Sequence, residues 1–256
     1  MQKKYTNEIL NLLRSMQNID YITPDEIPQI DLYMDQVTTF MDEHLRSSKR
    51  FEEDKILTKT MINNYTKNNL LPPPVKKKYS SEHMLMLIYI YYLKNFLSIN
   101  DIQSILNPLS DRFFGSTDGL SLSDIYKEIV DLEQENINSQ VRDIIRKLKK
   151  SGEAFEDVED PEDKKLLTTF AFICMLSFDV WVKKSVIENI IDDTLGSRKR
   201  NRYESHVAGL KALHRFYNVL FYMDLSKHRK VPVTFRCFFA YSSKKESGTA
   251  KCHKRT

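Results

Sequence analysis

The sequence predicts an all-α fold, and three observations lead to this prediction. Only 6 Gly and 8 Pro occur among 256 residues, and 41% of the residues are hydrophobic, which is typical of a globular protein with few turns. In most segments apolar residues recur every three or four positions, the period of a helix with one buried face. The length allows one large or two modest domains, and an acidic segment in mid-chain favours two lobes.

Three helices are expected in the first quarter of the chain. Residues 5–17 have apolar side chains at helical spacing, and the two prolines in the following YITPDEIP end this accessory helix. Residues 30–45 show the same period. Thr58 is placed to cap the third helix, because its hydroxyl can accept from the free backbone N–H of Thr60 or Met61.

The segment from Lys55 to Tyr79, KILTKTMINNYTKNNLLPPPVKKKY, contains six lysines and no acidic residue. Its helix has an apolar inward face that consists of Leu57, Met61, Ile62 and Tyr65. The outward face is polar and basic, and consists of Lys59, Thr60, Asn63, Thr66 and Lys67. The prolines from Pro72 to Pro74 stop the helix and force an extended path. We therefore expect the next three lysines on an extended arm: Lys76, Lys77 and Lys78.

Capping patterns predict the helices that follow. Ser80 or Ser81 caps a strongly apolar helix. Ser98 with Asp101 forms a capping box for a short helix that Asn107-Pro108 closes. The same capping box recurs in Ser121 and Asp124, ahead of helical segments that continue to Lys150.

The second half of the chain begins with an acidic segment. Residues 153–163 contain seven acids and no base, so that we expect a solvated lobe boundary there. Residues 161–195 are predicted as one long helix or two in succession, apolar on most sides. The membrane-like run from Leu166 to Val182 is 17 residues long and contains Asp179, below the roughly 20 apolar residues that span a bilayer. It is therefore predicted to be a buried helix, and its apolar excess favours a dimer.

The expected domains are an accessory helix at 1–27, a winged helix at 28–110, a helical lobe at 120–225 and a disordered basic tail at 226–256. The last 30 residues, 227–256, contain nine Lys and Arg but one Glu, a charge of +8. Because the whole chain has a formal charge of +4, residues 1–226 have −4. The tail is either a nucleic-acid-binding arm, a strand-like addition or a segment without function.

The sequence contains no motif of a catalytic or cofactor site. GxGxxG, Walker, HExxH and nucleophile-elbow patterns are absent, and the six histidines are scattered. The cysteines Cys174, Cys237 and Cys252 lack CxxC spacing, which favours a reducing cytoplasm. The N-terminus has no apolar core of the kind found in a secretory signal. We expect no enzyme, no cofactor, no metal and no membrane partner.

Several of these segments resemble known families. LTKTMINNY and NLLPP resemble the recognition helix and wing entry of MerR-type winged-helix regulators, and Tyr79 to Leu106 resembles that family's wing exit and next two helices. IDLYMDQVTTFMDEHL, together with LTKTMINNY and LLPPPVKKKY, is more closely similar to the bacterial domain of unknown function 1836. Members of that family are described as MerR-like regulators, and the resemblance covers about residues 20–195.

The MerR resemblance implies a helix in the DNA major groove, a wing on the phosphate backbone and a dimer that reads two half-sites. Carried over position by position, the resemblance implies that the following residues contact DNA: Thr58, Lys59, Thr60, Asn63, Asn64, Tyr65, Lys67, Lys76, Lys77 and Lys78. Asn63 and Asn64 stand where the family pattern has arginine, and this wing has lysine in place of glycine and arginine. Tyr65 is either a phosphate ligand or a packing residue.

We therefore expect a cytoplasmic, homodimeric regulator of transcription that binds double-stranded DNA, with room for a small-molecule effector in the helical lobe. Lysines would supply sequence-independent phosphate attraction, and asparagine can read the major-groove edge of adenine. The alternative is a helical protein–protein interaction adaptor that has a winged-helix scaffold without sequence-specific DNA binding, since a fold does not settle function. The −4 charge of residues 1–226 favours this alternative.

Overall fold

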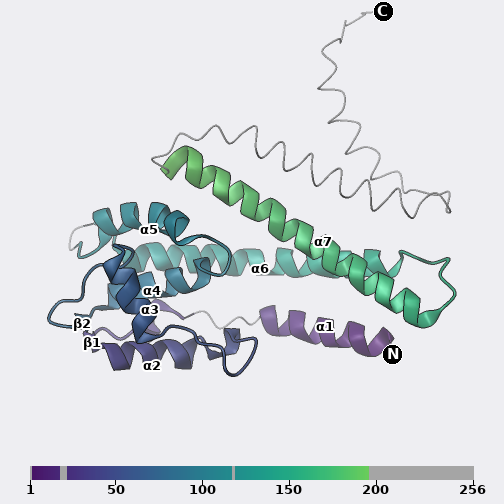
Figure 1. Ribbon diagram of the computed structural model, residues 1–256, viewed down its shortest axis with the longest axis horizontal. Helices are drawn as coiled ribbons and strands as arrows, with labels where there is room; N and C mark the ends of the chain where they lie inside the picture. Colours follow the sequence, from purple (N-terminus) through teal and green to yellow (C-terminus); the bar gives the residue numbers. More distant parts are fainter. Residues whose placement is uncertain (1, 18–21, 117–118, 196–256) are drawn as a thin grey trace, which may run out of the picture. The chain divides into compact units, whose positions relative to one another are not determined.

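The computed structural model describes residues 2–17, 22–116 and 119–195 (Figure 1). The chain divides into two compact units, residues 1–199 and 200–256, and every described residue belongs to the first unit. The predicted last helix, up to residue 225, and the basic tail at 226–256 lie outside the described residues. The described part is mostly helical, which confirms the all-α prediction.

Seven α-helices make up most of the described residues: α1 Gln2–Gln17, α2 Met34–His44, α3 Lys59–Lys67, α4 Ser81–Leu93, α5 Ile99–Phe113, α6 Leu122–Gly152 and α7 Pro161–Ile190. Shorter helical turns are η1 Pro24–Glu26, η2 Arg46–Ser48 and η3 Ile191–Leu195, the last a π-helical turn that continues α7. Two strands, β1 Leu32–Tyr33 and β2 Lys78–Tyr79, pair antiparallel. Leu32 lies opposite Tyr79, and Tyr33 lies opposite Lys78.

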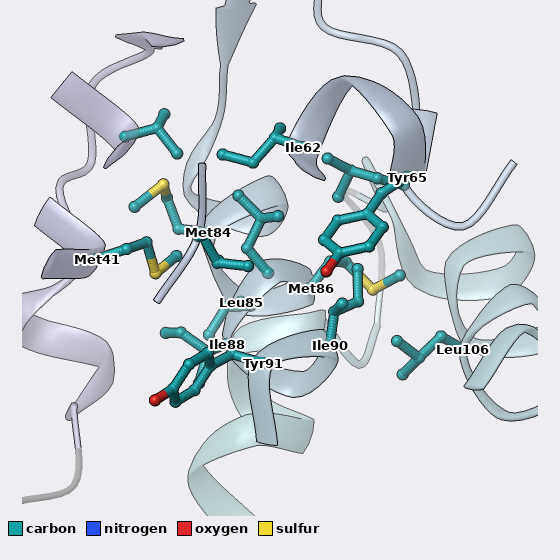
Figure 2. Close-up of a cluster of buried hydrophobic side chains, with 14 of the residues drawn as sticks. Met41, Ile62, Tyr65, Met84, Leu85, Met86, Ile88, Ile90, Tyr91 and Leu106 are labelled. Carbon is teal, nitrogen blue, oxygen red and sulfur yellow. The ribbon is translucent and has the colours of Figure 1, made fainter. Parts of the chain in front are cut away.

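The central element of the core is α4. Its residues 83–88, 90 and 91 are buried, as expected for a helix that is apolar on all sides. Figure 2 shows side chains of α2, α3 and α5 gathered around it, among them Met41, Ile62 and Leu106. The same cluster contains Tyr126 of α6, whose hydroxyl donates to the carbonyl of Ile22 at 2.7 Å. One core therefore joins the predicted winged-helix region to the start of the predicted helical lobe.

The predicted helix starts are confirmed in three places. The hydroxyl of Thr58 accepts from the backbone N–H of Met61 at 3.2 Å. Ser98 accepts from the N–H of Asp101 at 3.2 Å, and the Asp101 carboxylate accepts in return from Ser98. Ser121 and Asp124 form the same reciprocal pair at the start of α6. These interactions are local, and a sequence pattern can therefore predict them.

The predicted end of α5 at Asn107-Pro108 is wrong, because the helix continues through Pro108 to Phe113. A proline inside a helix removes one hydrogen bond and crowds the preceding turn. The extra turn brings Leu109, Phe113 and Phe114 against the core. Burial of these apolar side chains offsets the cost of the proline.

The helices α6 and α7 pack side by side. Residues 153–160 of the acidic segment form the loop between them, and residues 161–163 begin α7. Asp160 caps α7 by accepting from the N–H groups of Glu162 and Asp163 at 2.9 and 2.8 Å. Most residues of the loop are exposed, as predicted. It connects two packed helices, however, and the division into units falls near residue 199.

The prediction that residues 166–182 form a buried helix is wrong. Within α7 only Thr168 and Phe172 are buried. By length and composition alone, Pro161–Leu195 could cross a membrane, and a small part of its apolar stretch is buried within the described structure. Hydropathy reports how apolar a helix is, and the tertiary structure decides how much of it is covered.

Candidate nucleic-acid interface

The helix α3 is defined by local interactions at both ends. Thr58 caps its start, and Asn69 ends it in the left-handed conformation, with φ of 54°. The N–H of Leu70 donates to the carbonyl of Tyr65 at 2.9 Å, and the N–H of Asn69 donates to the carbonyl of Thr66 at 3.1 Å. This pair of bonds is a Schellman motif, in which asparagine takes the place of the usual glycine. In the sequence, this helix end corresponds to Asn68 and Asn69 followed by Leu70 and Leu71.

Helices α4 and α5 hold both ends of α3. The ammonium group of Lys94 donates to the carbonyl of Ile56 at 2.7 Å and lies 4.7 Å from the ring centre of Tyr91. Burial lowers the pKa of Lys94. At the other end, the side-chain amide of Gln103 donates to the carbonyl of Asn68, the residue after α3. The helix is thereby fixed against the core, with its polar face outward.

Of the outward face that the helical period predicted, Lys59, Thr60, Asn63 and Lys67 are exposed. Thr66 is partly buried and donates to the carbonyl of Ile62 at 3.3 Å, whereas Asn64 is exposed. Thr58 beside them is partly exposed, and its hydroxyl is engaged in the cap. Five of the predicted contact residues thus share one accessible surface. Lys59 differs from the others, because it forms an ion pair with Asp35 of α2.

Tyr65 belongs to the core and not to the polar face. Its side chain is 7% exposed, and burial raises the pKa of its hydroxyl. Figure 2 shows Ile62 and Tyr65 of α3 directed toward α4. Of the two roles expected for this residue, the structure shows the packing role. A phosphate contact would require the phenol to leave the core.

The expected extended arm is instead a tight turn. Val75 and Lys78 exchange backbone hydrogen bonds of 3.1 and 2.9 Å, and the two residues between them, Lys76 and Lys77, have φ of 49° and 64°. Positive φ at both central positions defines a type I′ hairpin turn, for which Asn-Gly is the preferred sequence. The correction has a simple cause: the prolines enforce an extended path only through Pro74, and a hairpin brings Lys78 back to pair with β1.

The three lysines of this turn therefore differ from one another. Lys76 and Lys77 are exposed at its tip. Lys78 is partly buried, pairs with Tyr33 through the backbone, and places its ammonium group 5.1 Å from the centre of that ring. Within the described part of the chain, no ion pair is recorded for Lys55, Lys67, Lys76 or Lys77.

His83 supports the base of the turn through local hydrogen bonds. Its Nδ1 accepts from the backbone N–H of Ser80 at 3.0 Å and lies 2.8 Å from the Ser80 hydroxyl. The ring packs edge-on against Tyr79 of β2 and against Phe114. Burial lowers the pKa of the imidazole, so that the neutral form is favoured. Histidine at this position acts as the partner in the capping box, where the usual signal is Glu or Gln.

The described residues contain no group of three or more His, Cys, Asp or Glu side chains that could hold a metal ion. The exposed groups on α3 and on the turn are ammonium, amide and hydroxyl groups. Such groups donate hydrogen bonds and attract anions. The surface is therefore suited to binding a polyanion.

Comparison with known proteins finds a family but no individual relative. No curated protein and no solved structure is similar enough to match the chain. Residues 22–129 match the family described as "Domain of unknown function (DUF1836)", from the segment before β1 into the first part of α6. This match supports the expected resemblance to the domain of unknown function 1836 over residues 22–129, a shorter stretch than the expected 20–195.

Proposed function

We propose that the protein is a transcriptional regulator that binds double-stranded DNA with α3 in the major groove and the Lys76–Lys77 turn against the phosphate backbone. The observation that carries the proposal is the exposed, acid-free face of α3 combined with a two-lysine turn in the same segment. The order of elements supports it, since β1, α2, α3, the turn, β2 and α4 follow one another as in a winged helix-turn-helix.

The backbone of the turn gives a physical reason to assign a function to its lysines. A residue other than glycine in the left-handed region costs roughly 1 kcal/mol or more, and two such residues are adjacent here. Asn-Gly would form the same turn with less strain. Lys76 and Lys77 form no ion pair with another described residue. What the two lysines add at the tip, in place of a less strained sequence, is therefore positive charge.

Recognition would combine attraction and base reading. Lys67, Lys76 and Lys77 supply charge that is indifferent to sequence, and affinity falls with rising salt because bound counterions are released. Asn63, Asn64 and Thr60 present hydrogen-bonding groups that can contact base edges, each good contact giving about 1 to 3 kcal/mol of discrimination. Because α3 is fixed at both ends, little ordering is needed on binding.

The proposal includes a homodimer that reads two half-sites in the cytoplasm, with any small-molecule effector bound to α6 and α7. The support for a dimer is the exposed apolar surface of α7. The support for a location in the cytoplasm is the cysteine pattern. Cys174, the cysteine that lies among the described residues, is a free thiol.

The test removes the charge of the two tip lysines but keeps a polar, unbranched side chain at each position. Lys76→Gln/Lys77→Gln is compared with Lys149→Gln/Lys150→Gln, an exposed lysine pair at the end of α6. Binding to genomic DNA fragments is measured at several salt concentrations. We expect log K of the first variant to fall less steeply with log salt, by about 2 in the magnitude of the slope. The second variant should leave the slope unchanged. Equal slopes in the two variants would contradict the proposed DNA contact.

A second candidate function is a protein–protein interaction adaptor. The −4 charge of residues 1–226 and the exposed apolar side chains of α7 favour it. Selection from random genomic fragments separates the two functions. A regulator enriches a defined sequence, whereas an adaptor enriches none.

A further inference from the structure

His83 lies where the segments that form the hairpin turn meet the core. It is the third residue of α4, its side chain is 3% exposed, and its ring packs edge-on against Tyr79 of β2, with ring centres 5.4 Å apart. It packs in the same way against Phe114, which follows α5, at 4.8 Å. The backbone of Pro72 and Pro73, which leads into the turn, also interacts with the ring. One buried side chain therefore joins both arms of the turn to two helices.

The hydrogen bonds of His83 require a neutral ring. The backbone N–H of Ser80 donates to Nδ1 at 3.0 Å, and a ring nitrogen that accepts a hydrogen bond carries no proton. The single proton of the neutral ring is therefore on Nε2, an atom that is buried and has no hydrogen-bond partner of normal geometry in the described part of the chain. The ring is thus held in one tautomer by the residue that directly follows β2.

A second proton would remove this support. The protonated ring donates from both nitrogens, so that Nδ1–H and the N–H of Ser80 would face each other as two donors. The Ser80 hydroxyl, 2.8 Å from Nδ1, can accept the new proton, but the backbone N–H then loses its acceptor. A positive charge would also lie in a buried site, which is unfavourable unless the charge is paired. Protonation of His83 therefore destabilises the contact between α4 and the end of β2.

The titratable groups on the elements around His83 do not compensate for this charge. Asp31, in the segment before β1, is exposed, and its attraction is smaller than the effect of burial. Tyr79 of β2 stays uncharged, because burial raises the pKa of its hydroxyl. Glu82 of α4 is engaged as the acceptor for the N–H of Gly115 at 2.7 Å. The net result is that burial lowers the pKa of the imidazole below its ordinary 6.5.

The hairpin turn is the part that yields when this support is lost. Its two central lysines are in the left-handed conformation, which is unfavourable for residues other than glycine. Two backbone hydrogen bonds between Val75 and Lys78 close the turn, and β2 has only two residues. A two-stranded pairing of this kind is at most marginally stable by itself. Because Val75 is 69% exposed, its side chain gains little from burial. The turn therefore depends on the anchoring of Tyr79 and Ser80.

We infer that His83 makes the hairpin turn sensitive to protons: the neutral ring holds the base of the turn, and the protonated ring releases it. Where the turn contacts DNA, acidification then weakens binding. This consequence rests on the proposed function, whereas the release of the turn does not. Its direction is opposite to the usual one, since added positive charge on a protein strengthens the attraction to phosphate.

The first test follows the full chain by NMR without DNA. The ring nitrogen shifts report the tautomer and the titration of His83, and amide hydrogen exchange reports the protection of Val75 and Lys78 relative to an unfolded chain. We expect the Nε2–H tautomer in the neutral ring. Protection of the two amides should fall severalfold as His83 is protonated in the wild type, and it should stay constant in His83→Gln, which retains a capping-box side chain.

The matched control for this test is His44→Gln. Nδ1 of His44 donates to the carbonyl of Phe40 at 3.0 Å, a bond that a protonated ring keeps, so that this variant should behave as the wild type. Protection of Val75 and Lys78 that stays unchanged through the titration of His83 would overturn the inference. An equal loss of protection in His83→Gln would overturn it as well.

The second test measures binding to genomic DNA fragments between pH 5 and 8 at constant salt. The affinity of the wild type is divided by that of His83→Gln, so that titration elsewhere in the chain cancels. We expect this ratio to fall with decreasing pH, by at most about tenfold per pH unit, because a single proton is excluded from the bound state. A turn that is released in the first test while the ratio stays constant would support the inference and contradict the proposed DNA contact.

Discussion

Lys59, the first residue of α3, forms an ion pair with Asp35 in the first turn of α2. The side chains are 59% and 76% exposed, and such exposed pairs add little to stability. Asp35 does, however, place an acidic group beside a lysine-rich segment that itself has none. It would compete with phosphate for the same ammonium group.

Asp35→Asn is expected to strengthen DNA binding by a few-fold and to steepen the salt slope of log K by up to about 1, because it frees Lys59 for a phosphate. Asp42→Asn is the control, since Asp42 is on the same helix and pairs with Lys49 at 2.7 Å, outside the candidate surface. Fluorescence anisotropy with labelled DNA at several salt concentrations provides the comparison. An unchanged affinity in Asp35→Asn would argue for the adaptor.

Lys76→Asn/Lys77→Gly is expected to change stability and binding in opposite directions. The preferred Asn-Gly sequence relieves two left-handed lysines and should raise the free energy of unfolding by about 1 kcal/mol. Loss of two charges should weaken DNA binding. Urea denaturation and salt-dependent binding are measured on the same preparation. A decrease in both the free energy of unfolding and the DNA affinity would show that the two lysines stabilise the fold.

Thr58→Ala is expected to lower the free energy of unfolding by about 1 kcal/mol, because the N–H of Met61 loses its acceptor. Thr58→Ser keeps the hydroxyl and should retain most of the stability. Urea denaturation of the three proteins gives the comparison. A loss of the same size in the serine variant would show that the methyl group matters more than the cap.

Stability is expected to fall as pH decreases below about 6.5, through protonation of His83. Burial lowers its pKa from the ordinary 6.5 in the folded protein, so that the unfolded chain binds the proton first and the folded state is penalised between the two values. His83→Gln retains a capping-box side chain and should reduce this dependence. Denaturation between pH 5 and 8 measures it. An equally steep dependence in the variant would assign the titration to another group.

The local capping interactions could be predicted from the sequence. Thr58, Ser98 and Ser121 cap helices as predicted, because a cap involves residues at most three positions apart. The polar face of α3 was predicted from helical spacing alone. The capping-box role of His83 beside Ser80 has no such signal, since histidine is not part of the usual pattern and its position depends on contacts with Tyr79 and Phe114.

Long-range packing decided the features that the sequence left open or indicated wrongly. Pro108 continues a helix because residues beyond it reach the core, and Lys78 turns back because β1 offers backbone partners. The burial of Tyr65 depends on α4, which is distant in sequence.

The sequence by itself determined that this chain is helical, where several helices start, and which segment concentrates lysines, because all three follow from spacing and composition. The tertiary structure decided that the lysines form a strained turn, that Asp35 reaches Lys59, and that the other described helices leave one side of α7 exposed. These depend on which surfaces meet, and contact between distant segments has no period in the sequence.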